Sequence, residues 1–264
     1  MSSENPSAAS VLLRFGAVAT GISAFFWVGG WLIQDEWLVD GLPVSAAMFI
    51  APGLAAWILA PPWPALLPYA GSTARAAVSL VGWSALLPAL VTASYVAMRL
   101  AGRHVPGEVG ASAGRVAVLC LAFLLAAICE EVGWTRFLTL HLLPKWTVVR
   151  TGVVVGALWA GLHVIPYAQA DRSWGWIAWQ CAFTVAFRVL IVAAVVVAGR
   201  WTVAVALHAS HNVAWALFPV GGSHYEPAYV APIVAVAAGL ILWRGVRGIG
   251  THRALFRTGQ MSVP

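Results

Sequence analysis

The chain is dominated by eight long apolar segments, and this pattern constrains its fold more than any other feature. Most of the segments reach the roughly 20 residues that a helix needs to cross a lipid bilayer. Charged residues make up only 9% of the 264 residues, against about 25% in a soluble domain. Because backbone groups in lipid must be satisfied within the protein, uninterrupted apolar runs of this length predict helices rather than a β-barrel. The segments span residues 11–33, 42–60, 76–98, 116–143, 148–168, 174–198, 201–220 and 228–243.

These segments predict an all-α fold, a polytopic membrane bundle of about eight transmembrane helices that forms one integral membrane domain over residues 1–264. Basic residues in alternate loops and in the tail predict a multi-pass protein of the cell membrane with both termini in the cytoplasm, by the positive-inside rule. These residues are Arg75, Lys145, Arg150, Arg200, Arg244, Arg247, Arg253 and Arg257. One loop departs from the rule because it carries Arg99, Arg103 and Arg115.

The net charge of +6 does not indicate binding to nucleic acid, because the basic residues are dispersed through loops and the tail. Such a distribution is typical of orientation signals and of contacts with anionic lipid, so the predicted partner is the lipid bilayer. The proline-rich stretch at residues 60–72 is expected to be a loop that lies along the membrane interface.

Two adjacent carboxyls, Glu130 and Glu131, interrupt the fourth apolar segment. Fourteen uncharged residues precede them, which is about two-thirds of a membrane crossing at the helical rise of about 1.5 Å per residue. An ionised group at that depth costs a few kcal/mol, so such residues usually serve a function and face a polar cavity. The pair therefore predicts a site inside the membrane.

The next three apolar segments carry further polar groups inside their apolar runs. His163 lies in the fifth segment, Arg188 in the sixth, and His208, His211 and Asn212 in the seventh. On a helix His208 and Asn212 share one face, since they are four residues apart. Because the first three segments have almost no such groups, the cost of burial predicts one polar site built by the four later helices.

The chemistry of this set is that of a hydrolase. A carboxylate beside an imidazole can take a proton from water and deliver it to a leaving amine. A second imidazole with an asparagine amide can donate hydrogen bonds to the oxyanion that forms when water attacks a carbonyl. Two histidines and one glutamate can also bind a divalent metal such as zinc with one position left open. Both interpretations, with and without a metal, stay open at this point.

Three motifs in this order resemble the CAAX-protease and bacteriocin-processing family of intramembrane proteases, to which type II CAAX prenyl endopeptidases belong. That family has a Glu-Glu pair followed by Arg, then an aromatic-xxx-His motif, then a His-xxx-Asn/Asp motif. In this chain CEEVGWTRFL contains Glu130 and Glu131, WAGLH contains Trp159 and His163, and LHASHN contains His208 and Asn212. The resemblance covers roughly residues 116–220, which are the candidate catalytic core helices.

The resemblance implies an intramembrane endopeptidase that hydrolyses a peptide bond of a membrane-embedded or lipidated protein or peptide. Glu130 and His163 would activate the water, while His208 and Asn212 would stabilise the oxyanion. Glu131 completes the candidate site, more as a structural charge than as a reacting group, because neighbouring helical residues point about 100° apart. If a metal is present, its candidate ligands are Glu130, His163 and His208.

One spacing departs from the family pattern. The usual arginine stands four residues after the second glutamate, where an ion pair can form along the helix. In this chain that position is Thr135, and Arg136 comes one residue later. Arg188 is the alternative partner for Glu131, because a buried guanidinium itself needs a carboxylate. Arg136 and Arg188 are therefore both candidate structural counter-charges.

Two other functions compete with the protease. A non-catalytic membrane scaffold or bacteriocin-immunity protein would use the polar cluster only to hold helices together. A proton-coupled transporter would also place Glu, His and Arg in mid-membrane, although no repeated halves are visible in the sequence. An amide and a second imidazole on one helix face favour the enzyme, because a scaffold needs only balanced charge.

Overall fold

The structure, a computed structural model, describes residues 7–33, 37–39, 42–59, 73–107 and 111–246. Each of the eight predicted apolar segments contains helix, which confirms the all-α class. Six helical stretches are long and apolar enough to cross a membrane. They comprise α1 (Ala8–Leu32), α3 (Thr73–Leu100), α4 (Ala113–Glu131) continued by η2 (Val132–Thr139) and α5 (Leu140–Leu142), α6 (Val148–Gln169), α7 (Trp174–Ala198), and α9 (Pro227–Ile241) continued by η3 (Leu242–Val246).

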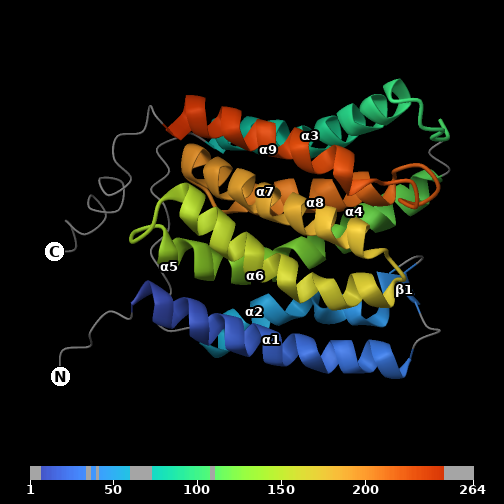
Figure 1. Cartoon of the computed structure of the whole chain (residues 1–264). Helices are drawn as coiled ribbons and strands as arrows, with labels where there is room; N and C mark the ends of the chain where they lie inside the picture. Colours follow the sequence, from blue (N-terminus) through green and yellow to red (C-terminus); the bar gives the residue numbers. More distant parts are fainter. Residues whose placement is uncertain (1–6, 34–36, 40–41, 60–72, 108–110, 247–264) are drawn as a thin grey trace, which may run out of the picture.

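The other two segments are shorter than predicted. The second consists of η1 (Val44–Ile50) and α2 (Ala51–Ile58), and the seventh is α8 (Thr202–Ala216), with 15 residues. Fifteen helical residues span only about 22 Å, less than the hydrocarbon core of a bilayer. The count of eight crossings is therefore approximate. The start of α1 and the end of α9 lie at the same end of the bundle, which agrees with an even number of passes (Figure 1).

A short antiparallel hairpin precedes η1. Strands β1 (Trp37–Val39) and β2 (Leu42–Pro43) pair with Trp37 opposite Pro43, and they form the one sheet found in the described residues. The predicted interfacial loop at residues 60–72 and the basic tail from Arg247 onward lie outside the described residues.

Hydroxyl side chains begin three of the helices that build the polar site, namely α4, α6 and α7. Ser112 accepts a hydrogen bond from the backbone N–H of Arg115 at the start of α4, and Thr147 and Ser173 cap α6 and α7 in the same way. Such caps satisfy backbone donors that a helix leaves unpaired at its first turn. Gly199 ends α7 in the left-handed conformation, with φ of 64°, which glycine adopts without strain. The sequence thus fixes where these helices start and stop.

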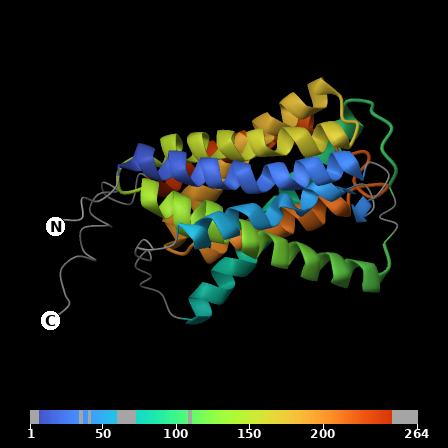
Figure 2. The same cartoon turned by 90° about the horizontal axis from the view of Figure 1, so that it is seen from below.

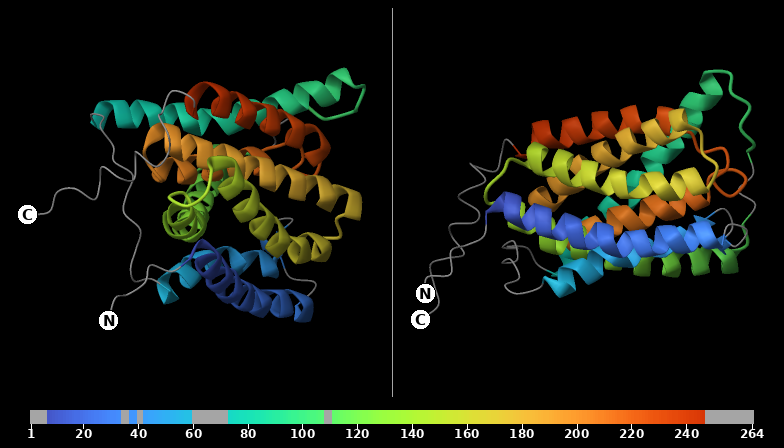
Figure 3. Two further views of the ribbon diagram at one scale, coloured as in Figure 1. Left: turned by 60° about the vertical axis from the view of Figure 1, so that its left-hand side comes forward. Right: turned by 60° about the horizontal axis from the view of Figure 1, so that its bottom comes forward.

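The helices lie in layers, with the site helices in the middle. Helices α1 and α2 form one outer side, α3 and α9 form the opposite side, and α4, α6, α7 and α8 lie between them (Figures 1 and 3). Seen from below, α1 and α2 lie in front, with α6 visible beside α1 and α4 extending past α2 (Figure 2). Helix α8 contacts α3, α4 and α7. Its polar face is therefore enclosed by protein on several sides.

Glycines allow the middle helices to approach one another closely. A Cβ atom added at Gly152 would come within 2.7 Å of the Cα atom of Val189, and one at Gly156 within 2.9 Å of the Cα atom of Val185. Small residues at helix contacts let backbones approach in membrane proteins, where van der Waals packing drives association. This contact between α6 and α7 brings Trp159 over Arg188.

We expect Gly152→Ala to lower the free energy of unfolding by about 1–3 kcal/mol, because the added methyl group overpacks the contact between α6 and α7. Gly161→Ala, on the same helix, is the matched control, since a Cβ atom there meets nothing within 4 Å. Thermal unfolding in detergent measures both variants. Equal midpoints for the two variants would contradict the tight crossing.

Candidate active site

Polar side chains from α4, η2, α6, α7 and α8 meet in the middle layer. Glu131, Arg188 and Thr135 are 0% exposed, and Glu130 and His208 are also buried. These groups thus lie together in one cluster, as the sequence predicts. Two sets of contacts can be separated, one around each glutamate.

Glu131 forms a two-pronged ion pair with Arg188 of α7. The Nη1 atom of Arg188 lies 2.8 Å from Oε2 of Glu131, and its Nη2 atom lies 2.9 Å from Oε1. This parallel geometry is the strong form of a carboxylate–guanidinium contact. The partner proposed for Glu131 on grounds of burial cost is therefore in contact with it, although 57 residues separate the two in sequence.

Thr135 takes the position where the motif usually has arginine. Its hydroxyl donates to Oε2 of Glu131 and accepts a hydrogen bond of 3.1 Å from Nη1 of Arg188. A guanidinium from another helix thus reaches the carboxylate, and the threonine ties the pair together. The arginine one residue later, Arg136, is half-buried.

The one-residue shift of Arg136 relative to the family motif falls within a π-helical stretch. Residues Val132–Thr139 form η2, whose backbone bonds join residues five apart. Gly133 lies in it against α2, and a Cβ atom there would come within 2.2 Å of the carbonyl oxygen of Pro52. A π-helix is the usual way for a helix to accommodate one additional residue, often at a functional site. Thr135 still keeps the i,i+4 contact with Glu131 at the start of this stretch.

His208 lies between the two glutamates. Its Nδ1 atom is 2.9 Å from Oε1 of Glu131, and its Nε2 atom is 3.8 Å from Oε1 of Glu130. The first distance is a hydrogen bond, while the second is too long for a hydrogen bond and falls within the range of an ion pair. Glu131 therefore fixes the orientation of the imidazole and directs Nε2 toward Glu130.

Trp159 connects Glu130 with His163. Its indole N–H donates to Oε2 of Glu130 at 2.9 Å, and its backbone carbonyl oxygen lies 2.9 Å from Nδ1 of His163. A carbonyl oxygen only accepts hydrogen bonds, so Nδ1 of His163 carries the proton and Nε2 of the neutral ring has a free lone pair. The geometry thus provides a carboxylate and a basic ring nitrogen held by one residue.

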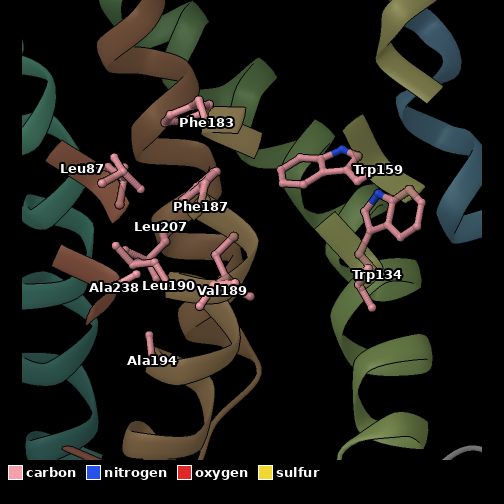
Figure 4. Close-up of a cluster of buried hydrophobic side chains, with 14 of the residues drawn as sticks. Leu87, Trp134, Trp159, Phe183, Phe187, Val189, Leu190, Ala194, Leu207 and Ala238 are labelled. Atoms are coloured by element: carbon pink, nitrogen blue, oxygen red, sulfur yellow. The ribbon is translucent and has the colours of Figure 1, made fainter. Parts of the chain in front are cut away.

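Aromatic side chains enclose this cluster. The guanidinium carbon of Arg188 lies 4.2 Å from the ring centroid of Trp159, an arrangement that favours a buried cation. The ring of Trp159 also lies 6.5 Å from that of Trp134 and 6.0 Å from that of Phe187. Figure 4 shows Trp134 and Trp159 next to each other and Phe187 on a neighbouring helix. Such a wall excludes water and strengthens the electrostatic interactions inside.

Asn212 contacts His211 rather than His208, the residue four positions before it. It shares a helix face with His208, but its Oδ1 atom is 3.2 Å from Nδ1 of His211. Asn212 is half-buried, and His211 is buried. His211 thus contacts the asparagine directly.

Three contributors to the site were missed by sequence reasoning. Trp159 was noted as a motif residue without a hydrogen-bonding role, and Thr135 only as the place of a missing arginine. Tyr225, whose hydroxyl lies 3.4 Å from Nε2 of His211, was not considered because it follows α8 in a loop. For Thr135 the signal was available, since a buried hydroxyl four residues after Glu131 lies on the same helix face.

The described residues contain no group of three or more His, Cys, Asp or Glu side chains placed to hold a metal ion. Glu130, His163 and His208, the ligands expected if a metal is used, do not form such a group. This arrangement does not fit a metal centre, so the mechanism below uses the side chains alone. The use of a metal stays a prediction that metal analysis can test.

Residues 112–214 match the model of a protein family described as type II CAAX prenyl endopeptidase Rce1-like. The matched region begins at the cap of α4 and ends within α8, so it contains all three motifs and Arg188. The family resemblance inferred from those motifs is confirmed for this part of the chain. The family's description is that of an endopeptidase, and the six long apolar helices indicate a multi-pass integral membrane protein. No curated protein matches the chain.

Proposed function

We propose that this protein of Rce1-like type is an intramembrane endopeptidase in which Glu130 and His163 activate the attacking water. The observation that carries the proposal is the double contact of Trp159, which holds the carboxylate of Glu130 and the ring of His163 from one side chain and its own backbone. A carboxylate and an imidazole fixed together can share the removal of one proton from water.

In the first step, water loses a proton to this pair and its oxygen attacks the carbonyl carbon of the scissile peptide bond. The C–O bond forms while the carbonyl π electrons move to oxygen and create an oxyanion. In the second step the oxyanion electrons re-form the carbonyl as the C–N bond breaks, and the amine takes the proton that Glu130 received. Glu130 thus acts first as a base and then as an acid, which returns the site to its initial state.

His208 and Asn212 would stabilise the oxyanion. For Nε2 of His208 to donate, the ring must be protonated on both nitrogens, since Nδ1 already donates to Glu131. With that proton, the charges of Glu130 and Glu131 are balanced by those of Arg188 and His208. A neutral cluster is the arrangement that burial in a membrane favours.

The expected substrate is a membrane-embedded or lipidated protein or peptide, because the site lies within helices that are apolar enough to cross a bilayer. Prenylated CAAX-type proteins, leader peptides and membrane-anchored regulators all fit this description, and peptide processing or bacteriocin self-immunity is the preferred role. We place the protein in the cell membrane with both termini in the cytoplasm, as the loop charges indicate.

The direct test is cleavage of candidate membrane peptides by the purified protein in liposomes. We expect cleavage by the unaltered protein and almost none by His163→Ala, because the free ring nitrogen of His163 is lost. Full activity of His163→Ala would remove this residue from the mechanism. Proton-linked uptake into the same vesicles without cleavage would instead support a transporter. Metal content is measured in the same preparation after removal of any affinity tag.

Trp159→Phe is expected to lower kcat by about tenfold or more with little change in KM, because a hydrogen bond to a charged group is worth about 1.5–3 kcal/mol. The matched control is Trp134→Phe, since the indole nitrogen of Trp134 is equally buried but has no hydrogen-bond partner in the described part of the chain. Steady-state kinetics compares the two variants. If both lose the same activity, packing rather than the contact with Glu130 explains the effect.

A further inference from the structure

The ring of His211, to which the proposed reaction gives no role, lies between two polar groups. On one side Nδ1 is 3.2 Å from Oδ1 of Asn212, and on the other Nε2 is 3.4 Å from the hydroxyl of Tyr225. Only 6% of His211 and 2% of Tyr225 are exposed. Phe183 stacks on the imidazole with a centroid distance of 4.6 Å and an interplanar angle of 27°. The ring is therefore fixed in place and in plane.

The direction of these hydrogen bonds follows from the groups that face one another. The Oδ1 atom of Asn212 can only accept, so Nδ1 of His211 carries the hydrogen. In the neutral ring Nε2 then has the lone pair and accepts from the hydroxyl of Tyr225. Burial raises the pKa of Tyr225 well above its usual value, so its hydroxyl keeps the proton that it donates. In this series of hydrogen bonds Tyr225 donates to His211, and His211 donates to Asn212.

The loop after α8 fixes the position of Tyr225, the last of the three hydrogen-bonded residues Asn212, His211 and Tyr225. Gly221 and Gly222 both have positive φ, and a Cβ atom at Gly222 would come within 2.8 Å of the carbonyl oxygen of Trp215. The backbone N–H of Tyr225 donates to the carbonyl of Gly222, and its own carbonyl accepts from the indole of Trp176. A tight turn therefore returns the tyrosine to the helix that carries His211.

We infer that Tyr225 and His211 are positioning residues that orient the side-chain amide of Asn212. With Oδ1 held by His211, the NH₂ group of Asn212 is turned away from the histidine and keeps both hydrogens for another acceptor. This inference rests on the proposed function, in which that acceptor is the oxyanion. It explains how the amide of Asn212 is oriented toward the oxyanion. A donor that is fixed before the reaction stabilises developing charge without the cost of reorganisation.

Tyr225→Phe tests the inference, because it removes one oxygen and keeps the ring. We expect kcat to fall about tenfold with KM unchanged, less than the 10²–10³ lost when an oxyanion donor is removed entirely. In the background of Asn212→Ala, Tyr225→Phe is expected to cause no further loss, since there is no amide left to orient. Tyr229→Phe on α9 controls for the loss of a tyrosine hydroxyl. Unchanged kcat in Tyr225→Phe, or an equal loss in both backgrounds, would overturn the inference.

A measurement that does not depend on activity separates this inference from the proposed function. In protein labelled with ¹⁵N-histidine, NMR is expected to show His211 with its hydrogen on Nδ1, and Tyr225→Phe is expected to shift the Nε2 resonance. A hydrogen on Nε2 would refute the inference, whatever the protein cleaves. Absence of cleavage together with the expected spectrum would count against the proposed function and leave the orientation of Asn212 supported.

Discussion

Replacement of Glu130 by glutamine is expected to reduce kcat by about 10²–10⁴-fold, the range that a positioned general base contributes. Glutamine has the same shape, and its carbonyl oxygen can still accept the hydrogen bond from the indole of Trp159. It cannot take a proton from water at neutral pH, nor return one to the leaving amine. The variant thus removes the chemistry of the residue while it keeps the contacts. Rates of peptide cleavage in liposomes measure the effect.

The adjacent residue supplies the control. Glu131 forms the ion pair with Arg188, whereas Glu130 contacts Trp159 and faces His208. Glu130→Gln should therefore unfold near the temperature of the unaltered protein, while Glu131→Gln should unfold at a lower temperature. If Glu130→Gln were as unstable as Glu131→Gln, its inactivity would reflect misfolding. Full activity of a stable Glu130→Gln would exclude Glu130 as the base.

Arg188→Leu is expected to lower the free energy of unfolding by about 3–5 kcal/mol, the usual cost of breaking one side of a buried ion pair. The substitution leaves Glu131 without its guanidinium at a position with 0% exposure. Thr135 and His208 remain as hydrogen-bond donors but do not replace the charge of Arg188. Thermal unfolding in detergent, with expression level as a second readout, measures the loss.

A double variant shows whether the loss comes from the unpaired charge. Replacing both partners, with Arg188→Leu and Glu131→Gln, removes the two charges together and should be clearly more stable than Arg188→Leu alone. Arg188→Lys keeps the charge but not the two-pronged geometry, so an intermediate stability is expected. If the double variant were the least stable of the three, the packing of Arg188 against Trp159 would be more important than its charge.

The helical bundle and the clustering of the polar groups could both be predicted from the sequence. Hydropathy locates the apolar segments because lipid leaves so few alternatives to a helix. The contact between Glu131 and Arg188 was also predictable from the cost of burial, since a charge in mid-membrane needs a partner. That argument identifies which groups must pair, and it needs no knowledge of the distance between them along the chain.

Details that depend on backbone geometry could not be obtained in this way. The π-helical stretch at Val132–Thr139 is one such detail, because hydropathy does not report it. The indole of Trp159 could equally have served for packing, because its N–H is one small polar group on a large apolar ring. Helix lengths were overestimated for the seventh segment, since apolar residues 217–220 continue past the end of α8 into a loop. Hydrophobicity marks the environment of a residue, not its backbone conformation.

The central claim is that this protein hydrolyses a peptide bond with Glu130 as the base. The most direct measurement is mass spectrometry of membrane-anchored peptides after incubation with the unaltered protein and with Glu130→Gln in liposomes. We expect two fragments whose masses sum to that of the peptide plus one water, formed by the unaltered protein and absent with the variant. Equal amounts of these fragments from both proteins, at equal folded protein concentration, would contradict the claim.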